Sequence, residues 1–425
     1  MVTRNNLYRF ASLLSAAVML FSCSGTIDPG DGLGGGENNG NVDNPGTGNN
    51  GGGQLVPKEL VVTADKKFVQ TFDGDFVTLT VTLGEEILTD GVTFYDADDN
   101  EIPVENFKFM TDKAGEHKIF AAYGTYFSQP VTVTAVAVAI PESPLDKSPE
   151  NVNFRPRVLM TQFTTTGCSY CPQMKILLKK ALTGDYLEKV VKVDCHSLII
   201  NNRNDPAYVD LEDFQDQCRV SGLPSVNLDM NQTDGNYLMP TIQMQEYIDS
   251  WIAFKDGKAA GISVNSVSTD SQIVTKVTVK AAETGTYRVG LMLLEDNIVA
   301  DPKLDQTQLG SGVEDWMNTH NSVVRYMDSK YPSGSGFSYY GHSLGEIAKG
   351  ATSDYLFILD LPSIWDAGSL KAEHNKSTWA KTWVKEELHL AVFVTTVGTD
   401  GKNEFYYVSN VVDCPIDGET PFEYK

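Results

Sequence analysis

The sequence is short of basic residues and, after its first segment, contains no long apolar run. It has 33 Lys and Arg against 56 Asp and Glu, which gives a formal net charge of −23 at pH 7. Because nucleic acids and anionic lipid surfaces attract basic proteins, this shortage of positive charge disfavours both as partners. Since no stretch after residue 22 is long and apolar enough to cross a bilayer, the sequence predicts no transmembrane helix there.

Residues 1–22 have the pattern of a bacterial signal peptide. Arg4 and Arg9 flank the start of an uncharged run at residues 10–21, which is too short to span a bilayer but suits a signal peptide. The cysteine that follows, Cys23, resembles the lipidated cysteine of a lipobox. The resemblance implies cleavage before Cys23 and acyl chains on its sulfur and amine, which would anchor the protein in a membrane. An ordinary signal peptide with an incidental Cys23 is the alternative.

The rest of the chain divides into a tether and three segments of domain size. Residues 23–56 are rich in Gly and Asn and contain no Lys or Arg, so we expect a flexible tether that buries no core. The remaining length fits three domains, which we place at residues 57–140, 154–258 and 259–425. Residues 141–153 contain several prolines and predict a stiff linker between the first two.

The first and third segments show the alternation of β-strands. In residues 57–140, short β-prone runs separated by turn signals predict an immunoglobulin-like β-sandwich. Residues 259–425 alternate in the same way and predict a C-terminal β-sandwich with a long irregular insertion at residues 302–349. The sequence GHSLG at residues 341–345 matches the lipase nucleophile motif. Because neither a buried strand nor a helix pattern flanks it, a hydrolase acting through Ser343 is the least favoured function, and a glycine-rich loop is favoured.

The segment that organises the α/β part is residues 158–183. A buried-strand pattern there leads directly into Cys168-Ser-Tyr-Cys171, and helix-like apolar spacing follows. The C-x-x-C therefore lies at the junction of a strand and the first turn of a helix, and we expect the helix to start at Cys168. Because a helix N-terminus favours an anion, we expect Cys168 to be exposed with a lowered pKa, and Cys171 to be buried one turn below. We expect the two cysteines to close a disulfide.

The elements downstream follow an order that resembles the thioredoxin fold. The patterns predict a strand at 190–194, a helix at 206–218, a strand at 225–230, a hairpin turn at 234–235 and a helix at 239–253. Leu223-Pro224 stands where that fold keeps a cis-proline loop against its C-x-x-C. The resemblance therefore implies that Leu223 and Pro224 guide the substrate.

The whole layout resembles a family of thioredoxin-fold outer-membrane lipoproteins of Gram-negative bacteria, first described as a twenty-eight-kilodalton outer-membrane protein. The resemblance rests on residues 158–174, 220–224 and 320–325, the last being HNSVVR. It implies a lipid anchor in the outer membrane, facing either the periplasm or the outside. Two positions depart from the family: Gln162 replaces an acid on the strand, and three threonines at 164–166 replace Thr-Gly-Trp. Since thioredoxins use that acid to accept a cysteine proton, Gln162 predicts slow exchange.

Three further cysteines follow the C-x-x-C. Cys195 ends the second predicted strand and Cys218 ends the following helix, positions that can approach each other, so a structural disulfide is the first expectation in an oxidising compartment. Cys414 is left over, and is either buried or paired with another thiol. The alternative is a zinc site, which we disfavour because the spacing of its ligands would be irregular: Cys168, Cys171, Cys195 and His196. We therefore expect no metal and no other cofactor.

Two functions remain besides the hydrolase. The first is a membrane-tethered thiol–disulfide oxidoreductase acting on thiols of exported proteins, with Cys168 as the nucleophile and Cys171 as the resolving thiol. The second is a binding or adhesion lipoprotein for surface ligands, in which the thioredoxin-like domain is a scaffold and the C-x-x-C a structural disulfide. The sequence does not decide whether the protein is an enzyme.

Overall fold

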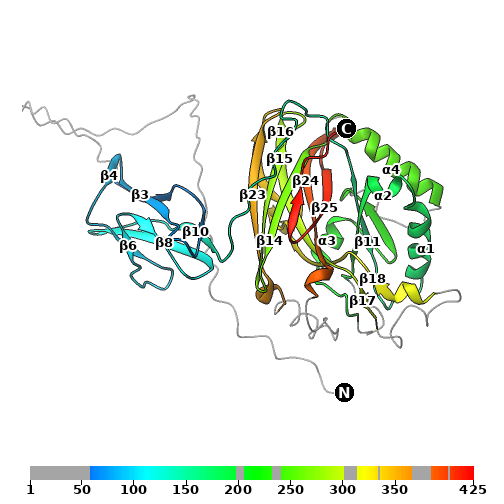
Figure 1. Cartoon of the computed structure of the whole chain (residues 1–425), viewed down its shortest axis with the longest axis horizontal. Helices are drawn as coiled ribbons and strands as arrows, with labels where there is room; N and C mark the ends of the chain where they lie inside the picture. The colour runs from blue at the N-terminus through cyan, green and yellow to red at the C-terminus, as the bar shows by residue number, and fades with distance from the viewer. Residues whose placement is uncertain are drawn as a thin grey trace, which may run out of the picture. The chain divides into compact units, whose positions relative to one another are not determined.

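In the computed structural model, shown in Figure 1, the described residues are 58–197, 205–231, 241–300, 314–333, 336–365, 384–400 and 403–425. They form a mostly β protein of several sheets, with one smaller region in which parallel strands combine with helices. Among these residues no helix is long and apolar enough to cross a bilayer. The signal peptide, Cys23 and the tether lie outside the described residues.

The first described part consists of two five-stranded sheets that share one apolar core. Strand β3 shows the local cause, because its valines and leucines are buried while its threonines alternate with them and are more exposed. One sheet has the order β1-β3-β7-β6 with β4 beside β3, and the other has the order β2-β10-β8-β5 with β9 beside β8. The strands are β1 Leu60–Ala64, β2 Phe68–Gln70, β3 Val77–Leu83, β4 Glu86–Leu88, β5 Thr93–Tyr95, β6 Val104–Glu105, β7 Lys108–Phe109, β8 Gly115–Tyr123, β9 Tyr126–Phe127 and β10 Val131–Val136.

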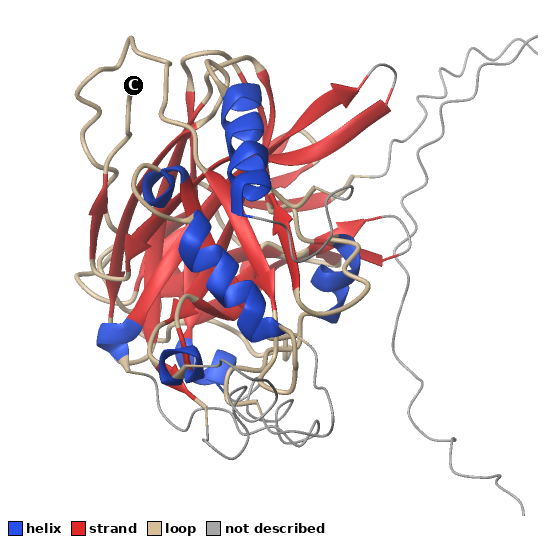
Figure 2. Ribbon diagram, turned by 90° about the vertical axis from the view of Figure 1, so that its right-hand side faces the viewer, coloured by secondary structure: helices blue, strands red, loops and turns tan. Residues whose placement is uncertain are grey.

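The α/β part is built around one strand with all its residues buried, β11 Val158–Phe163. It pairs in parallel with β12 Val190–Cys195 and antiparallel with β13 Ser225–Leu228. Apolar residues of the helices α1 Cys171–Ala181 and α4 Thr241–Lys255 share a cluster with Val158 and Met160, on one face of the sheet. Figure 2 shows helices lying in front of the strands. On the other face, Phe214 of α3 Glu212–Gln217 shares an apolar cluster with Leu159 and Phe163. The short helix α2 Tyr186–Lys189 precedes β12.

The sheet of the α/β part continues into the C-terminal part of the chain. Asp194 of β12 pairs in parallel with Val323 of β19, and β19 pairs with β16. The result is an eight-stranded sheet in the order β13-β11-β12-β19-β16-β24-β25, with β22 also pairing with β16. Its C-terminal strands are β16 Gly285–Glu295, β19 Val323–Asp328, β22 His342–Ile347, β24 Leu388–Asp400 and β25 Asn403–Pro415. Strands from the predicted second and third segments therefore share one sheet.

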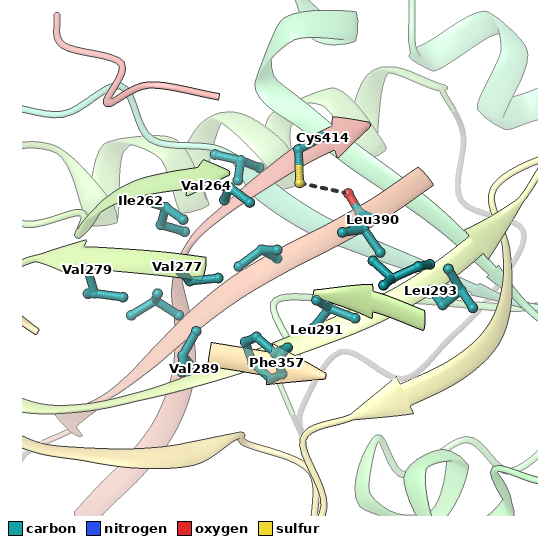
Figure 3. Close-up of a cluster of buried hydrophobic side chains, with 14 of the residues drawn as sticks. Ile262, Val264, Val277, Val279, Val289, Leu291, Leu293, Phe357, Leu390 and Cys414 are labelled. Carbon is teal, nitrogen blue, oxygen red and sulfur yellow. Dashed lines mark hydrogen bonds between the residues drawn. The ribbon is translucent and has the colours of Figure 1, made fainter. Parts of the chain in front are cut away.

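A second sheet of four strands, in the order β23-β15-β14-β26, shares the largest apolar core with this one. Figure 3 shows that core, with Val277 and Phe357 from the smaller sheet and Leu291 and Leu390 from the larger one. The strands are β14 Gly261–Ser268, β15 Gln272–Lys280, β23 Thr352–Asp360 and β26 Gly418–Thr420. The remaining short elements are β17 Ile298–Val299, η2 Asp315–Asn318, β18 Thr319–His320, β20 Tyr331–Ser333, β21 Gly336–Ser338 and η3 Lys385–Glu387.

Two predictions on secondary structure are wrong. The helix expected at residues 206–218 is only α3, Glu212–Gln217, because Tyr208 instead forms a parallel bridge with His196. The irregular insertion expected at 302–349 contains, in its described residues, strands of the main sheet. Strand β19 was missed because apolar and polar residues do not alternate along it. Most of its residues are buried, and one of these is Arg325.

Candidate functional site

The two cysteines of the C-x-x-C form the disulfide that the sequence predicts, Cys168–Cys171. Strand β11 ends at Phe163, a turn follows in which the Cys168 amide donates to the carbonyl of Thr165, and α1 begins at Cys171. The helix therefore starts at the second cysteine, three residues later than predicted. Pro172 in the first turn accounts for this, because a proline there loses no helical hydrogen bond.

The prediction that Cys168 is exposed is wrong. Cys168 is only 3% exposed and Cys171 is fully buried. The exposed residues of the motif are the two between the cysteines, Ser169 and Tyr170, and Tyr170 is 61% exposed. A partner approaching the disulfide would meet Ser169 and Tyr170 before either sulfur.

The Leu223–Pro224 peptide bond is cis, as its place in the predicted fold implies. The register of β11 with β13 pairs Phe163 with Ser225, the residue directly after Pro224. Because the strands are antiparallel, the proline loop lies at the edge of the sheet where the chain leaves β11 toward the disulfide. The structure thus brings the C-x-x-C segment and the proline loop to the same edge.

Gln162 is fully buried, and neither polar atom of its amide has a hydrogen-bond partner. Its register partner on β12 is Asp194, which is also buried and forms an ion pair with Lys192. The strand position that carries an acid in the resembling family is therefore occupied by an amide, and a carboxylate lies on the neighbouring strand. Sequence reasoning did not identify Asp194, because only the pairing of β11 with β12 brings it beside Gln162.

The turn before the disulfide is held by a buried carboxylate, Asp205. Its Oδ2 accepts hydrogen bonds from the Thr165 hydroxyl and the Thr166 amide, both at 2.9 Å, and lies 2.7 Å from Nδ1 of His196. Burial acts to raise the pKa of Asp205, but His196 and the donated hydrogen bonds outweigh it and hold that pKa below its usual value. A charged Asp205 thus fixes the two threonines that lead into Cys168.

A second buried contact ties α1 to the segment around β18. The ammonium of Lys175 donates to the carbonyl of Met317 at 2.7 Å and lies 3.0 Å from Nδ1 of His320. The rings of His320 and His196 meet edge to face, with centroids 4.7 Å apart. Burial, and then the charges of Lys175 and His196, hold the pKa of His320 well below its usual value, so its neutral ring accepts from Lys175. Burial lowers the pKa of Lys175 to about 8.

The HNSVVR segment that carries part of the family resemblance is buried at both ends. His320 and Arg325 are each 1% exposed. The Arg325 guanidinium lies 3.2 Å from Oε2 of Glu295 and donates to the carbonyl of Pro206 at 3.1 Å. Because Pro206 follows Asp205, this contact helps hold the loop that supports the disulfide segment. Sequence reasoning found His320 and Arg325 but missed Lys175, Asp205 and Glu295, whose partners are distant in sequence.

The disulfide predicted between Cys195 and Cys218 is absent, and both are free thiols. The two residues share one apolar cluster with Phe163 and Phe214, so the expectation that they lie near each other was reasonable. Burial raises the pKa of Cys195 to about 12 and that of Cys218 well above its usual value. Since the thiolate is the form that reacts, this burial disfavours oxidation.

Cys414 is also a free, buried thiol. Figure 3 shows it in the C-terminal core, where its Sγ lies 3.6 Å from the carbonyl of Leu390. The sequence left open whether Cys414 is buried or paired with another thiol, and the structure shows that it is buried and unpaired. The zinc arrangement would require the sulfurs of Cys168 and Cys171, and these are bonded to each other. Within the described ranges, no group of three or more His, Cys, Asp or Glu is placed to hold a metal ion.

The GHSLG segment at residues 341–345 is neither a nucleophile turn nor the glycine-rich loop that we expected, because most of it is strand β22. Ser343 lies in the antiparallel strand β22, opposite Arg288 of β16, and strand β23 follows without a helix. Gly341 has a φ of +103°, and a Cβ there would lie 2.5 Å from the backbone of Val289. The glycine is therefore needed for packing. The predicted hairpin turn at 234–235 lies outside the described residues.

Comparisons with known proteins show similarity of structure. No protein-family model matches the chain, and no curated protein sequence matches it. It is similar to HBP35 of Porphyromonas gingivalis, with 13% identity, coverage of 63% of this chain and 77% of that one, and a TM-score of 0.45. A protein from Agrobacterium tumefaciens is similar with 12% identity, coverage of 61% and 94%, and a TM-score of 0.36. Values this low assign no function to the chain.

Proposed function

We propose that this protein is a lipid-anchored thiol–disulfide oxidoreductase that exchanges disulfides with exported proteins. The observation that carries the proposal is the Cys168–Cys171 disulfide directly before and at the start of α1, at the sheet edge that also holds the cis Leu223–Pro224 bond. Cysteines in this arrangement can cycle between dithiol and disulfide. The proline loop would hold an extended substrate segment beside Cys168.

The proposed fold assignment follows the same residues. We assign residues 154–258 to a thioredoxin-like domain, which is supported by β11 between parallel β12 and antiparallel β13 with helices on both faces. Residues 57–140 would be an immunoglobulin-like domain and residues 259–425 a C-terminal β-sandwich, which is supported by pairs of sheets that share a core. Acyl chains on Cys23 would hold the protein at the outer membrane, facing the periplasm or the outside.

The exchange proceeds through one mixed disulfide. A substrate thiolate attacks the sulfur of Cys168, the bond between the cysteines breaks, and Cys171 leaves as a thiolate that takes up the proton lost by the substrate thiol. A second substrate thiolate then attacks the substrate sulfur of the mixed disulfide, and Cys168 leaves in turn. The substrate dithiol is oxidised by two electrons and the C-x-x-C is reduced. Because Cys168 is buried, the loop must open before each attack, and exchange should be slow.

A second function is favoured by one observation, the burial of Cys168 itself. If the loop does not open, the disulfide is a structural link within a scaffold, and the protein acts by binding surface ligands through other regions. In that case removal of either cysteine should lower stability alike, by a few kcal/mol at most, because the loop that the disulfide closes is short.

The test separates the two functions by trapping. Exchange is reversible, so in the opposite direction the Cys168 thiolate attacks a substrate disulfide and Cys171 then resolves the mixed disulfide. Cys171→Ala keeps that nucleophile and removes the resolving thiol, so we expect it to collect partner proteins as high-mass adducts that a reductant releases. Cys168→Ala is the matched control and should collect few. Absence of adducts from Cys171→Ala, together with a reduction potential below about −300 mV, would support the scaffold and reject the exchange function.

A further inference from the structure

A pocket with both polar and apolar lining lies beside the second and third turns of α1, on the helix-covered face of β11 and β12. Its volume is about 290 Å³. Its lining residues come from α1, α2, the two strands and the segment around β18: Gln162, Lys175, Leu178, Lys179, Leu182, Leu187, Lys192, Asp194, Trp316, Thr319 and Asn321. The volume is at the lower end of that of small-molecule sites.

The wall of this pocket contains a buried amide without a partner. Gln162 is 0% exposed, and both its Oε1 and its Nε2 lack a hydrogen bond. Leaving a buried polar group unpaired destabilises a protein by about 1–3 kcal/mol. Gln162 therefore has no evident role in packing or in internal hydrogen bonding. A ligand that bonded to its amide would account for a polar side chain at this buried position.

The charge around the pocket favours an anion. Lys192 is neutralised by Asp194, with which it forms an ion pair. Lys175 contacts only neutral groups in its hydrogen bonds, the carbonyl of Met317 and the ring of His320. Lys179 lies with its ammonium 4.2 Å from the ring centroid of Trp316. Within the described part of the chain neither Lys175 nor Lys179 forms an ion pair, so two positive charges face the pocket.

Polarity changes along the pocket. Gln162 and Lys175 are buried and form its deep end, whereas Leu187 is 65% exposed and lies at its mouth. Apolar surface from Leu178, Leu182 and Trp316 lies along the walls. A ligand that matches this arrangement has one negative end and one apolar end. A dianion fits less well, because the carboxylate of Asp194 also lines the pocket.

We propose that this pocket binds a small organic carboxylate, with its charged end at Gln162 and Lys175 and its apolar end toward Leu187. The amide Nε2 of Gln162 and the ammonium of Lys175 would donate to the carboxylate oxygens. Lys175 lies one helical turn after Cys171, so the ligand would sit next to the helix that begins at the disulfide. The proposal does not depend on redox activity.

Hexanoate is a suitable probe, and hexanamide is its neutral counterpart. We expect calorimetric titration of the full chain, with its disulfide intact, to show saturable binding of one hexanoate. Hexanamide should bind at least about tenfold more weakly, since it lacks the charge that Lys175 recognises. Inorganic phosphate should also bind more weakly. No saturable binding of hexanoate, or equal or tighter binding of hexanamide or phosphate, would overturn the proposal.

Two variants locate the bound probe. Gln162→Leu should raise the dissociation constant of hexanoate about tenfold, and thermal unfolding should show no loss of stability, because the substitution removes an unpaired buried amide. Lys180→Gln, on the exposed side of α1 and outside the pocket lining, is the control and should leave the constant unchanged. Equal affinities in the two variants would place the probe elsewhere and overturn the proposal. Either outcome leaves the exchange function to its own test, because binding requires no turnover.

Discussion

Nζ of Lys175 and Nδ1 of His320 lie 3.0 Å apart, although the two residues are 145 positions apart in sequence. Lys175 is in the helix that begins at the disulfide, and His320 is in β18. Both are buried, and His320 remains neutral because burial holds its pKa well below the usual value. The helix behind the disulfide is therefore tied directly to the C-terminal part of the chain.

Stability should depend on pH through Lys175. Burial lowers its pKa from 10.5 to about 8, against the opposing charges of Asp194 and Asp205, while Lys192 assists the shift and His320 faces it as a neutral ring. Between these two pKa values the unfolded chain binds more protons at this site, so its contribution to the free energy of unfolding rises with pH. The total change is on the order of 3 kcal/mol. Urea unfolding from pH 7 to 10.5 measures it.

Other groups titrate in the same range, so the comparison must be with a variant. Lys175→Met keeps the length of the side chain and removes the charge. We expect the wild-type protein to gain stability relative to Lys175→Met as pH rises from 8 to 10.5. A constant difference between the two proteins across that range would show that the pKa of Lys175 is not lowered.

Gln162→Glu should speed thiol–disulfide exchange. The substitution places a carboxyl group at the strand position where the resembling family has an acid, next to Asp194 in the sheet. Because a buried carboxylate can accept the proton of a cysteine, the reduction of a small disulfide by the reduced protein should become faster by about tenfold or more at pH 7. Gln162→Leu provides no proton acceptor and is the control. The idea is wrong if Gln162→Leu accelerates the reaction equally.

Cys195 and Cys218 should resist alkylation in the folded protein. Both are free and buried, and burial raises the pKa of Cys195 to about 12. Treatment of the folded protein with iodoacetamide should modify neither, and treatment after unfolding without a reductant should modify both. Mass spectrometry of the digest measures the alkylation of the peptides that contain Cys195 and Cys218. Detection of their two peptides joined by a disulfide would contradict the free-thiol state.

Cys23→Ala should release the protein from the membrane fraction. The resemblance to a lipobox implies that Cys23 carries the acyl chains, so its removal should abolish the proposed anchor. Labelled palmitate should enter the wild-type protein and a Cys414→Ala control, but not Cys23→Ala. Continued incorporation of palmitate into Cys23→Ala would reject the anchor.

Local patterns in the sequence were sufficient to predict the elements that hold the disulfide. The apolar run before Cys168 and the helical spacing after Cys171 correctly predicted β11 and α1, because burial of one strand and of one helix face leaves a direct mark on residue order. The cis bond before Pro224 was implied by the resemblance to the thioredoxin fold, and the structure has it. The start of α1 was misplaced because Pro172 in its first turn favours a helix that begins at Cys171.

The sequence by itself determined the C-x-x-C, the strand before it, the helix after it and the acidic charge of the chain. Only the tertiary structure decided that Cys168 is buried, that Cys195 and Cys218 are free thiols, and that Asp205, His196, Lys175 and His320 come together. The physical reason is the distance in sequence between the residues that interact. Periodicity records which side of one element faces the core, whereas a buried ion pair or hydrogen bond depends on partners that only the folded sheet brings together.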